Sequence, residues 1–167
     1  MKRVLFLLII TVFVFLIISP VYKQVNANTD LTNYSGITPD KTIRYPLKRI
    51  KEKVSVIFLS LFNKKSLGSY QLKLLNDRTN ELFYLAEHDK LPFIETAVSR
   101  YITQVGLVKD QLELDNVSGG KVTALLAGVY DKFEKLRDEF PAQSSMWLLY
   151  QQASDSTKVL VSDAQSK

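Results

Sequence analysis

From residue 45 onward, apolar side chains recur at intervals of three and four positions, the period of an α-helix that buries one face. No segment alternates for long enough to predict a strand. Pro46 suits the first turn of the first helix, because the N–H that proline lacks would have no partner there. The stripe that we expect this helix to bury consists of Leu47, Ile50, Val54, Ile57 and Leu61.

Four further helices are predicted from the same period. The second covers about 66–88, and the third follows Asp89, whose side chain is suited to cap it. The fourth runs without a break over 122–140, and the last begins at Ser144 or Ser145. Stripes at a mean spacing of 3.5 residues are typical of antiparallel helices that cross at shallow angles. The predicted fold class is therefore all-α, a four- to five-helix antiparallel bundle.

A different pattern precedes these helices. Lys2 and Arg3 are followed by an apolar run over 4–18 and by small side chains near Ala27, the order of a secretory signal peptide. The alternative is an uncleaved anchor, because residues 4–22 approach the roughly 20 residues that a bilayer core requires. The two basic residues hold the N-terminus inside in either case, so the rest of the chain is expected to be exported.

The chain thus divides into three predicted segments. Residues 1–27 form a signal peptide or signal anchor, residues 28–44 a polar, turn-rich linker, and residues 45–164 the helical bundle domain. The predicted location is extracytoplasmic, either secreted or anchored to the cell membrane by the N-terminal helix.

Composition excludes several classes of site. The chain has no cysteine and one histidine, which excludes disulfides, thiolate metal sites, a cysteine nucleophile and multi-histidine metal cages. The net charge is +5 over 167 residues, but without the three basic residues of 1–27 there remain 19 basic and 17 acidic side chains. Such a balanced surface lacks the dense basic footprint that nucleic-acid recognition uses, so we expect no nucleic-acid partner.

Candidate catalytic groups are few. Neighbours on a helix point about 100° apart, so Glu87, His88 and Asp89 do not converge on one atom, and we interpret them as a solvated helix end. Asp77 and Glu81 lie one turn apart and are interpreted as surface charges. The expectation is a protein that is not an enzyme, with no catalytic residue, no metal ligand and no cofactor.

Two groups of residues are candidates for binding. The first is a basic cluster at the start of the first helix, which would suit contact with an anionic membrane surface or, alternatively, form the solvated back of a bundle helix. It consists of Arg44, Lys48, Arg49, Lys51 and Lys53. The second is the pair Phe83 and Tyr84, which are consecutive and cannot both face inward, so that one of them would mark a partner surface.

The segment Tyr45-Pro46-Leu47-Lys48-Arg49, after the Pro39-Asp40 turn and at the start of a basic amphipathic helix, resembles a family of exported bacterial proteins of uncharacterised function. Residues 71–82 resemble the second helix of that family, and the likeness extends over about 38–112. The chain departs from the family at 61–65, where Leu-Phe-Asn-Lys-Lys replaces a frequent Phe-Thr-Phe-Asp-Pro. The resemblance implies an all-helical exported domain and supplies no catalytic residues.

Taken together, these features predict a cell-envelope helical module that works by binding or as a structural element. Its expected partners are the membrane, through the N-terminal segment if that segment is uncleaved, and a protein partner or a second copy in a homodimer. One alternative is an envelope sensor or holdase-like protein that uses an exposed apolar face. Another is an envelope hydrolase built on carboxylates between helices.

Overall fold

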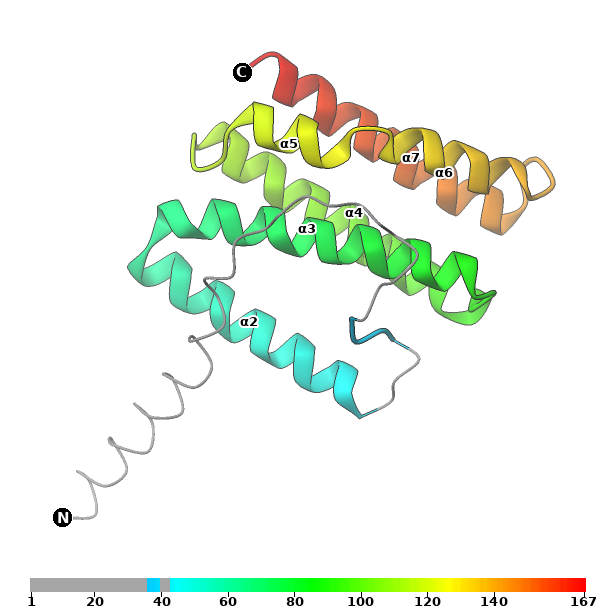
Figure 1. Ribbon diagram of the computed structural model, residues 1–167, viewed down its shortest axis with the longest axis horizontal. Helices are drawn as coiled ribbons and strands as arrows, with labels where there is room; N and C mark the ends of the chain where they lie inside the picture. The colour runs from blue at the N-terminus through cyan, green and yellow to red at the C-terminus, as the bar shows by residue number, and fades with distance from the viewer. Residues whose placement is uncertain (1–35, 40–42) are drawn as a thin grey trace.

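The computed structural model describes residues 36–39 and 43–167, and this part of the chain is an all-α bundle (Figure 1). The predicted fold class is confirmed, and the described residues contain no strand. The helices, labelled as in Figure 1, are α2 (Arg44–Phe62), α3 (Lys64–Glu87), α4 (Leu91–Glu113), α5 (Gly119–Leu126), α6 (Val129–Asp138) and α7 (Ser145–Gln165). The predicted signal peptide or anchor over 1–27 lies outside the described residues, and none of the helices described is both long and apolar enough to cross a bilayer.

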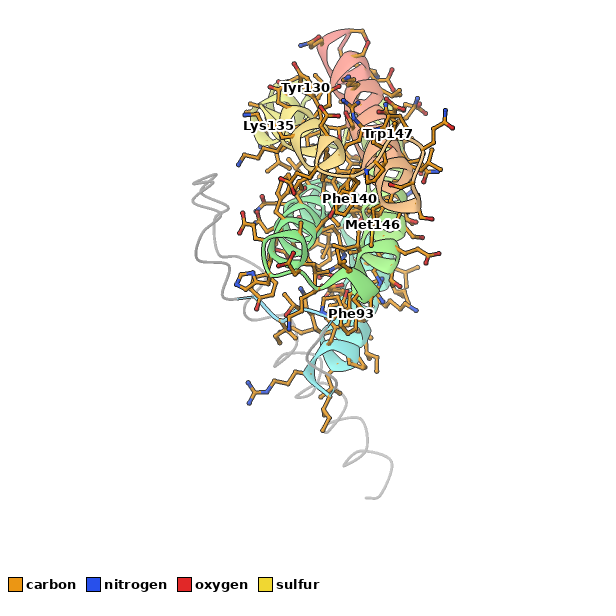
Figure 2. The ribbon with its side chains drawn as sticks, turned by 90° about the vertical axis from the view of Figure 1, so that its right-hand side faces the viewer. Phe93, Tyr130, Lys135, Phe140, Met146 and Trp147 are labelled. Atoms are coloured by element: carbon orange, nitrogen blue, oxygen red, sulfur yellow. The ribbon has the colours of Figure 1, made fainter. Side chains whose placement is uncertain are left out.

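The helices pack in sequence across the molecule. The antiparallel pair α3 and α4 lies in the middle, with α2 against α3 on one side and α7 against α4 on the other (Figure 1). The two short helices α5 and α6 both pack on α7. In the side view, α2 lies far from α6, which carries Lys135, and from α7, which carries Trp147 (Figure 2).

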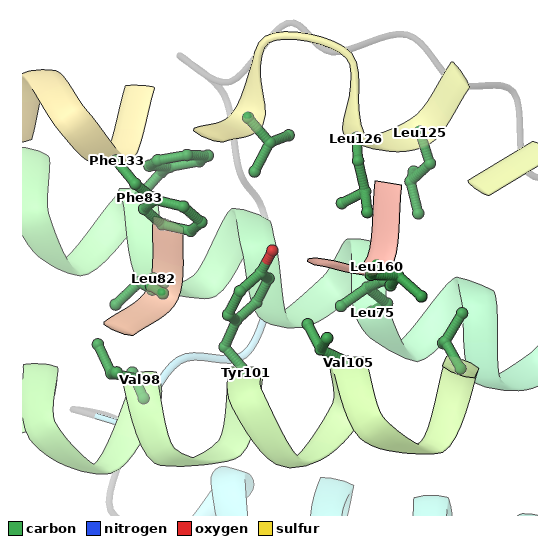
Figure 3. Close-up of a cluster of buried hydrophobic side chains, with 14 of the residues drawn as sticks. Leu75, Leu82, Phe83, Val98, Tyr101, Val105, Leu125, Leu126, Phe133 and Leu160 are labelled. Atoms are coloured by element: carbon green, nitrogen blue, oxygen red, sulfur yellow. The ribbon is translucent and has the colours of Figure 1, made fainter. Parts of the chain in front are cut away.

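One main hydrophobic core joins α3, α4, α5, α6 and α7. Helix α4, the third of the predicted helices, carries apolar side chains at intervals of three and four, and these are entirely buried in the core. They are Ile94, Val98, Tyr101, Val105, Val108 and Leu112. The ring of Phe133 fills the space between helices, with its centroid 4.9 Å from that of Phe83 and 5.1 Å from that of Tyr101 (Figure 3). The Tyr101 hydroxyl lies 2.6 Å from the Thr157 hydroxyl, so this buried polar group has a partner.

The predicted fourth helix is broken in two, so the expectation of an unbroken helix over 122–140 is wrong. Gly128 separates α5 from α6 with a φ of 70°, a left-handed conformation that glycine adopts without steric cost. Gly119, at the start of α5, packs so closely against the backbone carbonyl of Ala164 in α7 that a Cβ at this position would collide with it. The two short helices on either side of this break both pack on α7.

The caps predicted at the helix ends are found in part. Of the two serines predicted to begin the last helix, Ser144 caps α7, and its hydroxyl accepts the N–H of Trp147 at 3.3 Å. Asn63 alone separates α2 from α3, and its side chain accepts the N–H of Ser66 at 3.1 Å. Asp89 does not cap α4, because it occupies the preceding turn with a φ of 51° and the cap position falls on Lys90.

Candidate interaction surface

Helix α2 lies on the bundle with its apolar side outward. The stripe Leu47, Ile50, Val54, Ile57 and Leu61 was predicted to be buried, and this prediction is wrong. Ile43 and Phe62 extend the stripe at its two ends, and all seven side chains are between 40% and 79% exposed. We call these seven residues the outer apolar face.

The opposite side of α2 faces the bundle and is largely polar. Its residues recur at the same spacing of three and four as the outer stripe, and they are Tyr45, Lys48, Glu52, Ser55 and Leu59. Leu59, with Val56 beside it, joins a small hydrophobic cluster on α3 that is separate from the main core. Polar groups therefore provide much of the contact between α2 and its neighbours, which explains why the apolar stripe faces away from them.

A buried charge cluster, formed by Glu52, Arg78 and Glu81, connects α2 to α3. The Arg78 guanidinium donates to Glu81 Oε2 at 2.9 Å and to Glu52 Oε2. The side chains of Arg78 and Glu81 are each 1% exposed and that of Glu52 is 9% exposed. One cation thus stands between two carboxylates from different helices, in a site nearly closed to water.

Tyr45 extends this cluster to a third helix. Its hydroxyl donates to Glu81 Oε1 at 2.6 Å and accepts a hydrogen bond from Arg100 of α4. Burial and the neighbouring Glu81 carboxylate raise the pKa of the Tyr45 phenol above its ordinary value, so the phenol remains a proton donor to that carboxylate. The start of α2 is therefore held to both α3 and α4.

The interpretation of Glu81 as a surface charge is wrong, and a pattern in the sequence accounts for its position. Gln71, Leu74, Arg78, Glu81 and Leu85 follow one another at spacings of three and four, and all five are buried. Because Arg78 and Glu81 share a helix face with Leu74 and Leu85, this spacing is the signal from which a buried ion pair could have been predicted.

Asp77 lies one residue outside that phase and is half-buried. Burial raises the pKa of its carboxyl, against the influence of Lys48 and Lys73.

The five basic residues predicted to contact a membrane divide into two groups. Lys48 turns inward, where its ammonium donates to the carbonyl of Ile37 at 3.1 Å and lies 3.8 Å from Glu81 Oε2. Burial lowers the pKa of this ammonium, although the nearby Glu81 carboxylate opposes the shift. Arg49 also turns inward and donates to Glu52 at 2.8 Å.

The other three basic residues remain exposed and border the outer apolar face. At about 100° per residue, Arg44 and Lys51 lie along one edge of the face and Lys53 along the other. The only acidic residue of α2 is Glu52, which is turned to the bundle and engaged by Arg78. The outward half of α2 therefore combines apolar side chains with positive charge alone.

The structure separates the two residues of the second candidate surface. Phe83 is buried in the main core, so of this pair it is the residue that faces inward and it forms no part of an exposed surface. Tyr84 is half-buried and packs against that core, and its ring stacks on the His88 ring at a centroid distance of 4.1 Å. Within the part of the chain that the structure describes, no group of three or more histidine or acidic side chains is placed to hold a metal ion.

Comparison with protein-family models, with curated proteins and with solved structures yields no match for this chain. The resemblance described for residues 38–112 therefore stays a prediction. The geometry of α2 is the feature on which a functional proposal rests.

Proposed function

We propose that the protein is an exported cell-envelope helical module, anchored or secreted, that works by binding through the outer apolar face of α2. The observation that carries this proposal is the exposure of seven apolar side chains along one face of α2 and at its two ends. Isolated exposed apolar residues are common, but contiguous apolar patches on soluble proteins mark surfaces that contact something else.

The dimensions of this face suit a binding role. Its residues from Ile43 to Leu61 recur at spacings of four, three, four, three and four, so they form one line along the helix. A helix of 19 residues is about 28 Å long, which gives the face an extended shape rather than that of a pocket. The export part of the proposal is supported by the sequence pattern of residues 1–27.

Site-specific photocrosslinking of the full chain in cells tests the proposal. A photoreactive benzoylphenylalanine replaces Leu47 or Ile57 on α2, and Val159 on α7 serves as the control, because it is apolar, 53% exposed and on the opposite side of the bundle. We expect crosslinked products from both α2 positions and none from the control. Absence of products at both α2 positions, or equal products from the control, would contradict binding through this face.

The same experiment separates two kinds of binding. A holdase, which uses an apolar surface to retain many unfolded chains, gives a broad ladder of products, whereas a dedicated partner gives one or a few bands. Cell fractionation tests the export part of the proposal, and full-length chain found in the cytosol at steady state would contradict it.

A further inference from the structure

We propose that the outer apolar face of α2 docks on an anionic membrane surface, with the helix axis parallel to the membrane plane. This inference rests on the proposed function, and it names the partner of that same face. Helices that lie in a membrane interface bury an apolar face among the acyl chains and place lysine and arginine at its borders, beside anionic headgroups. The exposed side of α2 has this arrangement.

Charge is the first argument. Arg44 and Lys51 border one edge of the face and Lys53 the other, and all three are exposed. Lys64 and Lys65, also exposed, follow Phe62 after a single residue, Asn63, at the end of the face. Since the acidic residue of α2 is held on the inner side, the face offers positive charge along both edges and at one end with no negative charge between.

The same charges argue against a second copy as the occupant. In a two-helix coil, the residues beside the apolar seam pair with opposite charges on the partner helix. Here the charged bordering residues Arg44, Lys51 and Lys53 are all basic, so two copies bring like charges together whether the helices run parallel or antiparallel. Anionic lipid headgroups satisfy the same charges without that repulsion.

Geometry also favours a membrane. Among the described helices, α3 packs on the inner side of α2, and α6 and α7 lie far from it (Figure 2), so none of these helices covers the outer face. Phe58 and Phe62 form an aromatic pair near the end of the face, with centroids 4.7 Å apart. Twenty residues separate the apolar segment 4–22 from Ile43, and they span at most about 70 Å. A retained anchor would therefore hold α2 within reach of its own membrane.

The absence of cysteine from the chain allows a direct measurement of membrane depth. The full chain is reconstituted into phosphatidylcholine vesicles with or without phosphatidylglycerol, with a nitrobenzoxadiazole fluorophore on a single cysteine introduced by Ile57→Cys. Val159→Cys is the matched control, because both positions are exposed and apolar. With phosphatidylglycerol present, we expect a blue shift at position 57 and quenching by lipid-attached nitroxide, and neither change at position 159.

Charge variants test the anionic part of the proposal. Lys51→Glu with Lys53→Glu should abolish the response at position 57, whereas Lys121→Glu with Lys135→Glu should preserve it, because these exposed lysines belong to α5 and α6. All four positions are exposed, so circular dichroism should show the same helix content in every variant. A response that does not depend on phosphatidylglycerol, or that is equal in both variant pairs, would overturn the anionic docking.

Failure of this inference differs from failure of the proposed function. If position 57 shows no lipid quenching while photocrosslinking at Leu47 or Ile57 captures a second copy or a single protein partner, the membrane is excluded and binding through the face stands. If neither lipid quenching nor crosslinking is found, both proposals fall together.

Discussion

Replacement of Arg78 by methionine tests how the buried charge cluster holds α2 to the bundle. Methionine keeps an unbranched side chain of similar length but leaves the carboxylates of Glu52 and Glu81 without their shared cation. Removal of one partner from a buried ion pair costs about 3–5 kcal/mol, because an uncompensated charge remains in a site with little water. Since Arg78 is 1% exposed and serves two carboxylates, we expect a loss of about 4–5 kcal/mol in the free energy of unfolding. This is a large part of the 5–15 kcal/mol typical of a folded domain.

The loss should be concentrated at α2. The main core contains no buried side chain of α2. Once Arg78 no longer binds Glu52, the helix is held mainly by Tyr45, by Lys48 near Glu81 and by the small cluster around Leu59. Amide hydrogen exchange in α2 should therefore accelerate more than exchange in α4. A matched control is Lys158→Met, which removes an exposed ion pair with Glu134 and should change stability little.

The assay is denaturant unfolding of the full chain in detergent at neutral pH, followed by circular dichroism and compared between variants. The triple variant Glu52→Gln, Arg78→Met and Glu81→Gln should recover much of the stability, because it leaves no buried carboxylate without its cation. A loss of less than about 1 kcal/mol in Arg78→Met, or a triple variant no more stable than Arg78→Met, would refute the argument that uncompensated buried charge is the cause.

Further predictions concern the core, two glycines and the carboxyl of Asp77. Phe133→Ala should cost about 3–5 kcal/mol in denaturant unfolding, because Phe133 is fully buried between two aromatic rings. Gly119→Ala should lower the thermal midpoint, because its Cβ would collide with the Ala164 carbonyl, whereas Gly106→Ala, in open space within α4, should raise it. Burial raises the pKa of Asp77, so the folded protein binds that proton more tightly than the unfolded chain, and stability falls as pH rises through the range above 3.8. Asp77→Asn should therefore be more stable than the parent at pH 7 and equal to it well below pH 3.8, which denaturant midpoints measured across pH would show.

Apolar periodicity predicted helix α4 and its buried residues well, because this helix packs on both α3 and α7 and its apolar stripe faces them. The start of α7 was equally accessible from the sequence, since a serine cap acts on the N–H groups next to it. Features of this kind depend on residues close together in the chain.

The side of α2 that faces the bundle could not be predicted from the sequence in the same way. Periodicity shows that one side of a helix is apolar, but the element that covers this side is a property of the whole fold. In α2 the polar residues Tyr45, Glu52 and Ser55 have the same spacing as the apolar stripe, so the pattern fitted either side. The partners that decide between them, Arg78 and Glu81, lie more than 20 residues away.

The break at Gly128 affects how α5 and α6 keep their apolar sides against α7. A straight α-helix rotates by about 20° in every seven residues relative to a stripe of period 3.5, so an unbroken helix over 119–138 would turn its stripe by roughly 60° away from α7. Coiled coils avoid this drift by winding around each other along their whole length. Here one left-handed glycine divides the drift between two short helices, of 8 and 10 residues, and both pack on the 21-residue α7.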